Sequence, residues 1–215
     1  MEIEVNESGA HAASGMGRRA LLGAGVGGVA LSLVPFLSGH AAASATTDEP
    51  TTSTTIPPLR PTADDIALLA QAQQLELTAQ ALYDEALALS GWSDEQAVVV
   101  VYLREAHQAY ANALSGLLGR DAPGARSEKV FSALQTDFAG SAEGVLAAAY
   151  ALEAVAAATH ADVLSQLQGT GAAALIASIQ MNEARYGTVL ADMQGNTDDA
   201  DLLVTADAES LVGQL

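Results

Sequence analysis

The sequence predicts an all-α fold: an antiparallel four-helix bundle with one long crossover between its second and third helices. In four long segments, apolar residues recur at alternating three- and four-residue steps, which places them on one face of each helix. The connections within the first and second helix pairs are short, whereas residues 120–140 separate the pairs. Half of the 215 residues are hydrophobic but only 4% are aromatic, so the core must consist of Ala, Leu, Val and Ile, which suits closely packed helices.

Residues 1–45 have the order of parts of a bacterial export signal. Arg18-Arg19 precedes a Gly/Ala/Leu/Val stretch that runs through Leu37, and Ala43-Ser44-Ala45 offers an A-x-A cleavage site. This order resembles a twin-arginine signal. The alternative is an uncleaved membrane anchor, for which the apolar segment is short and rich in glycine. We therefore expect an exported protein, periplasmic or extracellular, with no stable membrane insertion once the signal is cleaved.

Composition narrows the classes of partner. Residues 46–61 are rich in Thr and Pro and are expected to form a solvated linker, and residues 196–215 form an acidic tail. The formal charge of -18 leaves no basic patch for nucleic acid or for anionic lipid. Because the chain has no Cys, disulfides and thiolate metal sites are excluded. The partner that we expect is therefore another protein or a second copy of this chain.

The first helix pair is delimited by capping residues. The first helix is expected over Thr62–Ser90, with Thr62 as its N-cap. The second is expected over Ser93–Gly119, where Ser93 and Gln96 form a capping box.

The second helix pair follows the long connection, which itself contains a candidate short helix over 128–137. The third long helix is expected over Ser141–Leu167. A tight turn at Gly169-Thr170-Gly171 leads into the fourth, with Thr170 as a candidate cap, and Gln194 ends it before Gly195. These four helices make one bundle domain over residues 62–195.

Each apolar stripe is interrupted by an ionisable side chain: Glu76, His107, Glu153 and Glu183 in chain order. An ionised group in a core stripe is costly unless it is paired, protonated or bound to a cation. We therefore expect these four side chains to converge inside the bundle. His160, seven residues after Glu153 and ~10 Å further along the axis, is expected to lie apart with a local hydrogen bond.

Four segments then resemble the ligand-bearing helices of bacterial ferritin-like proteins, over about residues 62–194: LELTAQALYDEAL, LREAHQAYANALSGLLG, AAAYALEAVAAATH and SIQMNEARYGTVLADM. The resemblance implies a dinuclear carboxylate site, in which two of the four helices supply single Glu residues and the other two supply Glu-x-x-His. It also implies metal-dependent oxidation or iron handling. Glu76 and Glu153 match the single Glu positions.

The other two helices depart from that pattern, with His107-x-x-Tyr110 and Glu183-x-x-Tyr186 in place of Glu-x-x-His. A neutral phenol is a poor ligand for a divalent ion but a good donor to a carboxylate. One hypothesis is that Glu76, His107, Glu153 and Glu183 bind a single iron, manganese or zinc ion, with Tyr110 and Tyr186 as hydrogen-bonding or redox-active neighbours.

The other hypothesis is a site that binds no metal. Tyr110 and Tyr186 then donate to the interior Glu side chains, and His107, helped by Arg104, supplies compensating positive charge. Tyr83 is expected to be a packing residue. Because two family ligands are missing, the sequence favours a non-catalytic binding or structural module with a degenerate carboxylate site. The alternative is a metal-binding protein with oxidase or iron-handling activity.

Overall fold

A computed structural model describes residues 58–196 and 207–215. The predicted export signal, most of the predicted linker and residues 197–206 of the tail lie outside the described residues. Within them, the regular structure consists of five α-helices and one 3-10 turn, without a strand. The elements are α2 (Ala63–Leu87), α3 (Asp94–Leu118), η2 (Gly119–Asp121), α4 (Glu128–Phe138), α5 (Ala142–Gln166) and α6 (Thr170–Met193).

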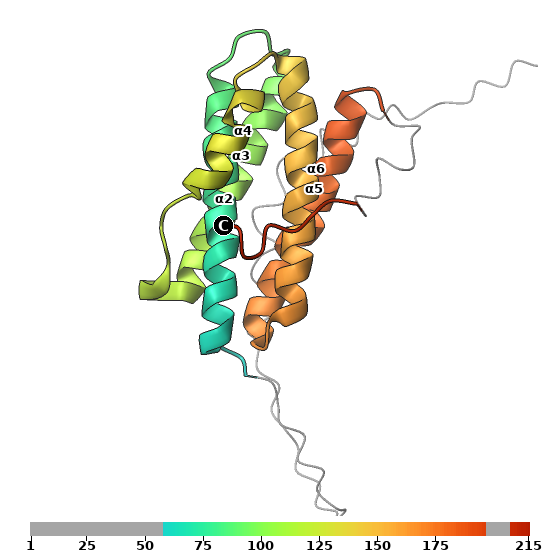
Figure 1. Cartoon of the computed structure of the whole chain (residues 1–215). Coiled ribbons are helices and arrows are strands. Elements are labelled where there is room, and N and C mark those ends of the chain that lie inside the picture. Colours follow the sequence, from blue (N-terminus) through green and yellow to red (C-terminus); the bar gives the residue numbers. More distant parts are fainter. Residues whose placement is uncertain (1–57, 197–206) are drawn as a thin grey trace, which may run out of the picture. The chain divides into compact units, whose positions relative to one another are not determined.

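The long helices form a bundle of two closely packed pairs. α2 packs along α3, and α5 packs along α6 (Figure 1). The shorter α4 lies in the connection between α3 and α5 and packs against α2 and α5. The core between them consists of small and aliphatic side chains, with Tyr83 and Phe138 as its largest fully buried members.

Capping residues begin the first two long helices as the sequence predicts. The Thr62 hydroxyl accepts from the Asp65 N–H, and the Asp65 carboxylate accepts from the Thr62 N–H. Ser93 and Gln96 form the same reciprocal pair at the start of α3. The predicted short helix is confirmed as α4. Since each cap satisfies backbone donors that the first turn leaves unpaired, the caps account for where these helices begin.

The predicted capping role of Thr170 is wrong. Thr170 is the first residue of α6, and Gly169 precedes it without a side-chain cap. Other segments satisfy the free N–H groups instead. The Asp65 carboxylate accepts from the Gln168 and Gly169 N–H groups, at 2.8 and 2.9 Å. The Thr170 N–H donates to the Pro58 carbonyl at 2.9 Å.

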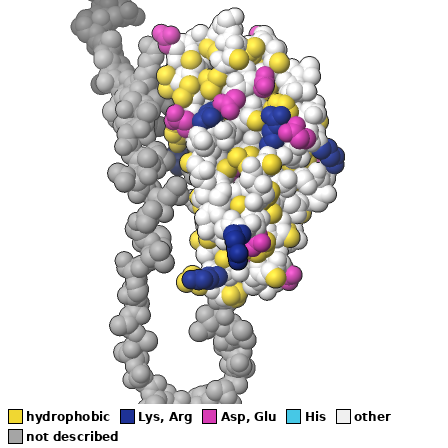
Figure 2. Space-filling model, turned by 90° about the vertical axis from the view of Figure 1, so that its left-hand side faces the viewer, with side chains coloured by type: hydrophobic (Ala, Val, Ile, Leu, Met, Phe, Trp, Pro, Cys, Tyr) yellow, Lys and Arg dark blue, Asp and Glu magenta, His cyan; other side chains and the backbone are white. Residues whose placement is uncertain are grey.

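On the face that Figure 2 shows, basic and acidic side chains of the described residues lie beside one another, with apolar side chains scattered among them.

One described helix, α5, is long and apolar enough to cross a membrane by length and composition. Half of its most apolar window is buried, and a buried core helix passes the same test, so α5 is weak evidence for a span.

Candidate metal centre

Five ionisable side chains meet in the middle of the bundle, and each is completely buried. They come from all four long helices: Glu76 from α2, His107 from α3, Glu153 and His160 from α5, and Glu183 from α6. Each occupies a core position of its helix, because three- and four-residue steps link it to the buried apolar residues on either side. The predicted convergence of Glu76, His107, Glu153 and Glu183 agrees with this placement.

The five side chains alternate as carboxylates and imidazoles, and we call them the carboxylate–imidazole chain. Glu153 Oε1 lies 3.0 Å from His107 Nε2, and His107 Nδ1 lies 2.7 Å from Glu76 Oε2. On the other side, Glu76 Oε1 lies 3.2 Å from His160 Nε2, an ion-pair contact, and His160 Nδ1 lies 2.8 Å from Glu183 Oε2. Each imidazole therefore lies between two carboxylates that come from different helices.

The expectation that His160 lies apart from the cluster is wrong. Its axial separation from Glu153 excludes a shared ion between those two residues, but not membership of a chain that extends along the bundle. Glu76 reaches His107 with one oxygen and His160 with the other. The detectable signal in the sequence was the position of His160 on the same stripe as Glu153.

The tyrosines make different contacts from those predicted. Tyr110 and Tyr186 hydrogen-bond each other, with 2.7 Å between their hydroxyl oxygens, rather than the interior Glu side chains. Tyr83 instead donates to a carboxylate of the cluster: its hydroxyl lies 2.6 Å from Glu153 Oε1. Its ring stacks on His107, with 5.5 Å between centroids and 18° between planes. Tyr83 is thus a site residue that the sequence analysis assigned to packing.

The predicted help from Arg104 is also wrong. Its guanidinium lies at the surface, where Nε donates to Asp84 Oδ1 at 2.8 Å. Among the described residues, His107 and His160 are therefore the groups that supply positive charge to Glu76, Glu153 and Glu183.

The pKa values of His107, His160 and Glu183 are all raised above their usual values. Burial alone would lower the pKa of His107, but the carboxylates of Glu153 and Glu76 outweigh burial and raise it well above the usual 6.5. Burial would also lower the pKa of His160, but the Glu183 and Glu76 carboxylates outweigh burial and raise that pKa to about 9. Burial raises the pKa of Glu183 to about 7, against the stabilising charge of His160. The cluster therefore favours bound protons near neutral pH.

The phenols are held in their neutral form. Burial is the largest cause that raises the pKa of Tyr83, followed by the charge of Glu153. Burial likewise raises the pKa of Tyr110 and of Tyr186 far above 10. Because a phenol binds metal well only as a phenolate, these shifts disfavour all three tyrosines as ligands.

Four buried polar atoms of the carboxylate–imidazole chain make no hydrogen bond among the described residues, although two of them, Glu76 Oε1 and His160 Nε2, form the ion-pair contact with each other. The four atoms are Glu76 Oε1, Glu153 Oε2, His160 Nε2 and Glu183 Oε1. One potential ligand atom each from Glu76, His107 and Glu183 lies within 4.8 Å of the others. This trio is the part of the cluster whose geometry is compatible with one cation.

These residues do not fit a dinuclear centre of the Glu-x-x-His type. Both imidazoles of that pattern are replaced by phenols, Tyr110 and Tyr186, which bond each other. His107 stands at the Glu position of one motif, and both of its ring nitrogens already contact carboxylates. A single ion would require a nitrogen of His107 to leave one of those contacts.

Comparison with known families agrees with the helical architecture. The family model for the ferritin-like domain matches residues 64–196, more than half of the chain. The chain therefore belongs to the ferritin-like domain family. No curated protein and no solved structure matches it.

Proposed function

We propose that this protein is an exported, non-catalytic ferritin-like module, in which the carboxylate–imidazole chain, held by hydrogen bonds and ion-pair contacts, takes the place of a metal centre. Its scaffold in this proposal is an antiparallel four-helix bundle with one long crossover. The position of α4 between the two helix pairs supports that scaffold. The protein acts through its surface, on a protein partner or a second copy.

The observation that carries the proposal is the pair of contacts made by His107. Its Nδ1 and Nε2 lie 2.7 and 3.0 Å from the carboxylates of Glu76 and Glu153. An imidazolium donates through both nitrogens, whereas a neutral ring donates through one and accepts from a protonated carboxyl through the other. In either arrangement both ring nitrogens are engaged in hydrogen bonds, so no lone pair remains for a metal.

Charge balance supports the same conclusion. Three carboxylates and two imidazolium rings carry a net charge of about −1, and one further proton makes the cluster neutral. Glu183, whose pKa is raised to about 7, is the group that holds such a proton. Protons thus provide the compensation that a buried group of carboxylates needs.

Metal analysis tests this proposal directly. The chain is produced in the bacterial cytoplasm with iron, manganese and zinc added, and metal per chain is measured by mass spectrometry. We expect substoichiometric metal and a thermal midpoint that a chelator leaves unchanged. One ion per chain, absent from Glu183→Gln but retained by the surface variant Glu85→Gln, would overturn it.

A second candidate function rests on the three carboxylate oxygens that make no hydrogen bond and on the Glu76, His107 and Glu183 trio. These atoms form an oxygen-rich set suited to a single iron, manganese or zinc ion. Such an ion would supply Lewis-acid or redox chemistry for iron handling or oxidation. This candidate predicts that a chelator lowers the thermal midpoint of the wild-type chain but not that of Glu183→Gln.

Export is tested separately from the cluster. Replacing Arg18 and Arg19 together by Lys keeps the charge of the proposed signal and removes its arginine pair. We expect the protein to stay in the cytoplasm at full length, while Arg60→Lys is exported and cleaved like the wild type. Export of both variants to the same extent would contradict the twin-arginine route.

A further inference from the structure

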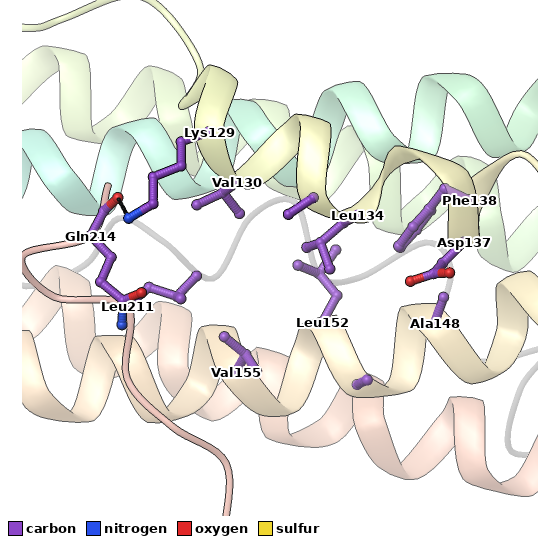
Figure 3. A pocket seen from close by; sticks show the side chains of 12 residues that line it. Lys129, Val130, Leu134, Asp137, Phe138, Ala148, Leu152, Val155, Leu211 and Gln214 are labelled. Carbon is purple, nitrogen blue, oxygen red and sulfur yellow. Dashed lines mark hydrogen bonds between the residues drawn. The ribbon is translucent and has the colours of Figure 1, made fainter.

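A shallow apolar groove of about 270 Å³ lies between α4 and α5, away from the carboxylate–imidazole chain (Figure 3). Aliphatic side chains of both helices line it, with Phe138 and Asp137 at one end and Lys129 at the other. Leu134 and Val155 in its walls are only half-buried. The groove therefore leaves apolar surface open that a side chain of the right shape can cover.

The C-terminal segment, residues 207–215, enters this groove at the end beside Lys129. Leu211 and Gln214 are among the groove's lining residues, and both lie at that end in Figure 3. The Leu211 N–H donates to Thr159 Oγ1 at 3.0 Å, and the Ser210 hydroxyl donates to Asp162 Oδ2 at 2.9 Å. These two bonds hold the backbone against α5 where the side chain of Leu211 meets the groove.

The same segment then contacts two other helices. The Gly213 N–H donates to Gln71 Oε1 of α2, and Lys129 Nζ of α4 donates to the Gln214 carbonyl at 3.5 Å. Val212, directly before Gly213 and Gln214, packs against the core. Gly213 has φ +79°, a conformation that side-chain-bearing residues rarely adopt, so glycine permits the bend between α5 and α2. Figure 1 shows the segment crossing α5 on its way to α2.

Polar contacts flank the Leu211 side chain where it enters the groove, as they flank a peptide side chain held in a receptor pocket. Main-chain hydrogen bonds fix the register of such a peptide, and a pocket selects its side chain. Phe138, Asp137 and Ala148 lie at the opposite end from Leu211 and Gln214 (Figure 3). The segment thus closes one end of the groove, as a strap across three helices.

We propose that the α4–α5 groove is a docking site for a peptide whose central aliphatic residue is followed by a tight turn, and that the chain's own C-terminal segment is its resident, releasable occupant. In that segment the turn is closed by the Gln214 N–H, which donates to the Leu211 carbonyl at 2.8 Å. Release would open the end of the groove beside Lys129, which Val130 and Val155 line. A partner can occupy that end only when the strap is displaced. This proposal does not depend on whether the carboxylate–imidazole chain binds metal.

The first test uses the full chain and amide hydrogen exchange. We expect exchange at the Leu211 amide to be slowed about tenfold or more relative to the free peptide Asp207–Leu215. Thr159→Val keeps the shape of the side chain but removes the acceptor, and should return the rate to that of the free peptide. Glu209→Gln, at an exposed position of the same segment, should keep the protection. A Leu211 amide that exchanges at the free-peptide rate in the wild type would overturn the proposal.

The second test adds the segment back in trans. A chain that ends at residue 206 is compared with the full chain by NMR of the methyl groups of Val130, Leu152 and Val155. We expect these resonances to shift on truncation and to return as the peptide Asp207–Leu215 is added. Millimolar peptide is required, because the tethered segment has an effective concentration in that range.

Peptide variants make the second test specific. A peptide with Leu211→Asp should produce no return of the methyl resonances, whereas the Glu209→Gln peptide should match the wild type. Identical methyl spectra for the full and truncated chains would refute the docking, as would equal responses to the Leu211→Asp and Glu209→Gln peptides.

Discussion

Glu76 and His160 lie 84 positions apart in the chain, and their Oε1 and Nε2 atoms lie 3.2 Å apart in the core. This contact joins two halves of the buried cluster. Without it, the Glu153–His107–Glu76 group and the His160–Glu183 pair would be separate. The free energy of the fold and its dependence on pH therefore involve all four long helices together.

The first prediction concerns the stability of the protein as a function of pH. The folded-state pKa is raised at Glu183, from 4.5 to about 7, and at His160, from 6.5 to about 9. In both cases the folded state binds more protons than the unfolded state, so stability must fall as pH rises between about 4.5 and 9. We expect a loss on the order of a few kcal/mol between pH 5 and pH 9, measured by urea unfolding. In Glu183→Gln the part of the loss below pH 7 should disappear, and stability that rises across this window would contradict the assignment.

A second prediction compares a buried with an exposed ion pair. His160→Leu leaves the Glu183 and Glu76 carboxylates without their imidazole, and should lower the free energy of unfolding by about 3–5 kcal/mol. Arg104→Leu removes the surface partner of Asp84 and should cost less than about 1 kcal/mol. Chemical denaturation at pH 7 measures both. Equal losses would show that His160 is a packing residue and not part of the charge balance.

Tyr83→Phe is the third prediction, and it removes one hydroxyl while keeping the ring that stacks on His107. The lost bond goes to the Glu153 carboxylate, so the expected loss of stability is about 1.5–3 kcal/mol. Tyr110→Phe breaks a bond between two neutral phenols and should cost about 0.5–1.5 kcal/mol. Thermal unfolding of the two variants gives the comparison. A larger loss in Tyr110→Phe would indicate that the tyrosine pair carries charge.

The fourth prediction concerns Asp65, whose carboxylate accepts backbone hydrogen bonds from Thr62, Gln168 and Gly169. Burial opposes ionisation, but these bonds outweigh it and lower the pKa of Asp65. Its stabilisation is therefore present above the unfolded-state pKa near 3.8 and is lost as pH falls through the folded-state value. Asp65→Ala should cost about 2–3 kcal/mol at pH 7, and the exposed neighbour Asp64→Ala about 0.5 kcal/mol. If both substitutions lowered the urea midpoint equally, the backbone hydrogen bonds of Asp65 would not be the source of its stabilisation.

Much of the helical framework could be predicted because its signals are local. Caps such as Thr62 and Ser93 act within one turn, and the buried stripes repeat at steps of three and four residues. The start of α6 was mispredicted because its N–H groups are satisfied by Asp65 and Pro58, which are distant in sequence. The residues around Thr170 do not indicate hydrogen-bond partners that lie so far away in the sequence.

The sequence predicts which residues lie in the candidate site better than it predicts which of them contact one another. Glu76, His107, Glu153 and Glu183 could be found because an ionisable residue in an apolar stripe stands out. His160 was excluded by its distance from Glu153 along one helix. That distance does not measure whether Glu76, from another helix, reaches both imidazoles. The same limit applies to Tyr83, since its partner Glu153 lies on α5 and the sequence does not specify which side chains meet across the core.

The path by which the chain enters the bundle has a mechanical consequence. The Pro58 and Leu59 carbonyls accept from the Thr170 and Gly171 N–H groups, at 2.9 and 3.1 Å. A Cβ at Gly169 would lie 2.9 Å from the Arg60 carbonyl oxygen, and a Cβ at Gly171 would lie 2.8 Å from the Leu59 carbonyl oxygen. The two backbone segments therefore fit together only because neither glycine carries a side chain. Tension on the polypeptide ahead of residue 58 would therefore load the beginning of α6 as well as α2. A pull from that side is borne by both helix pairs at once.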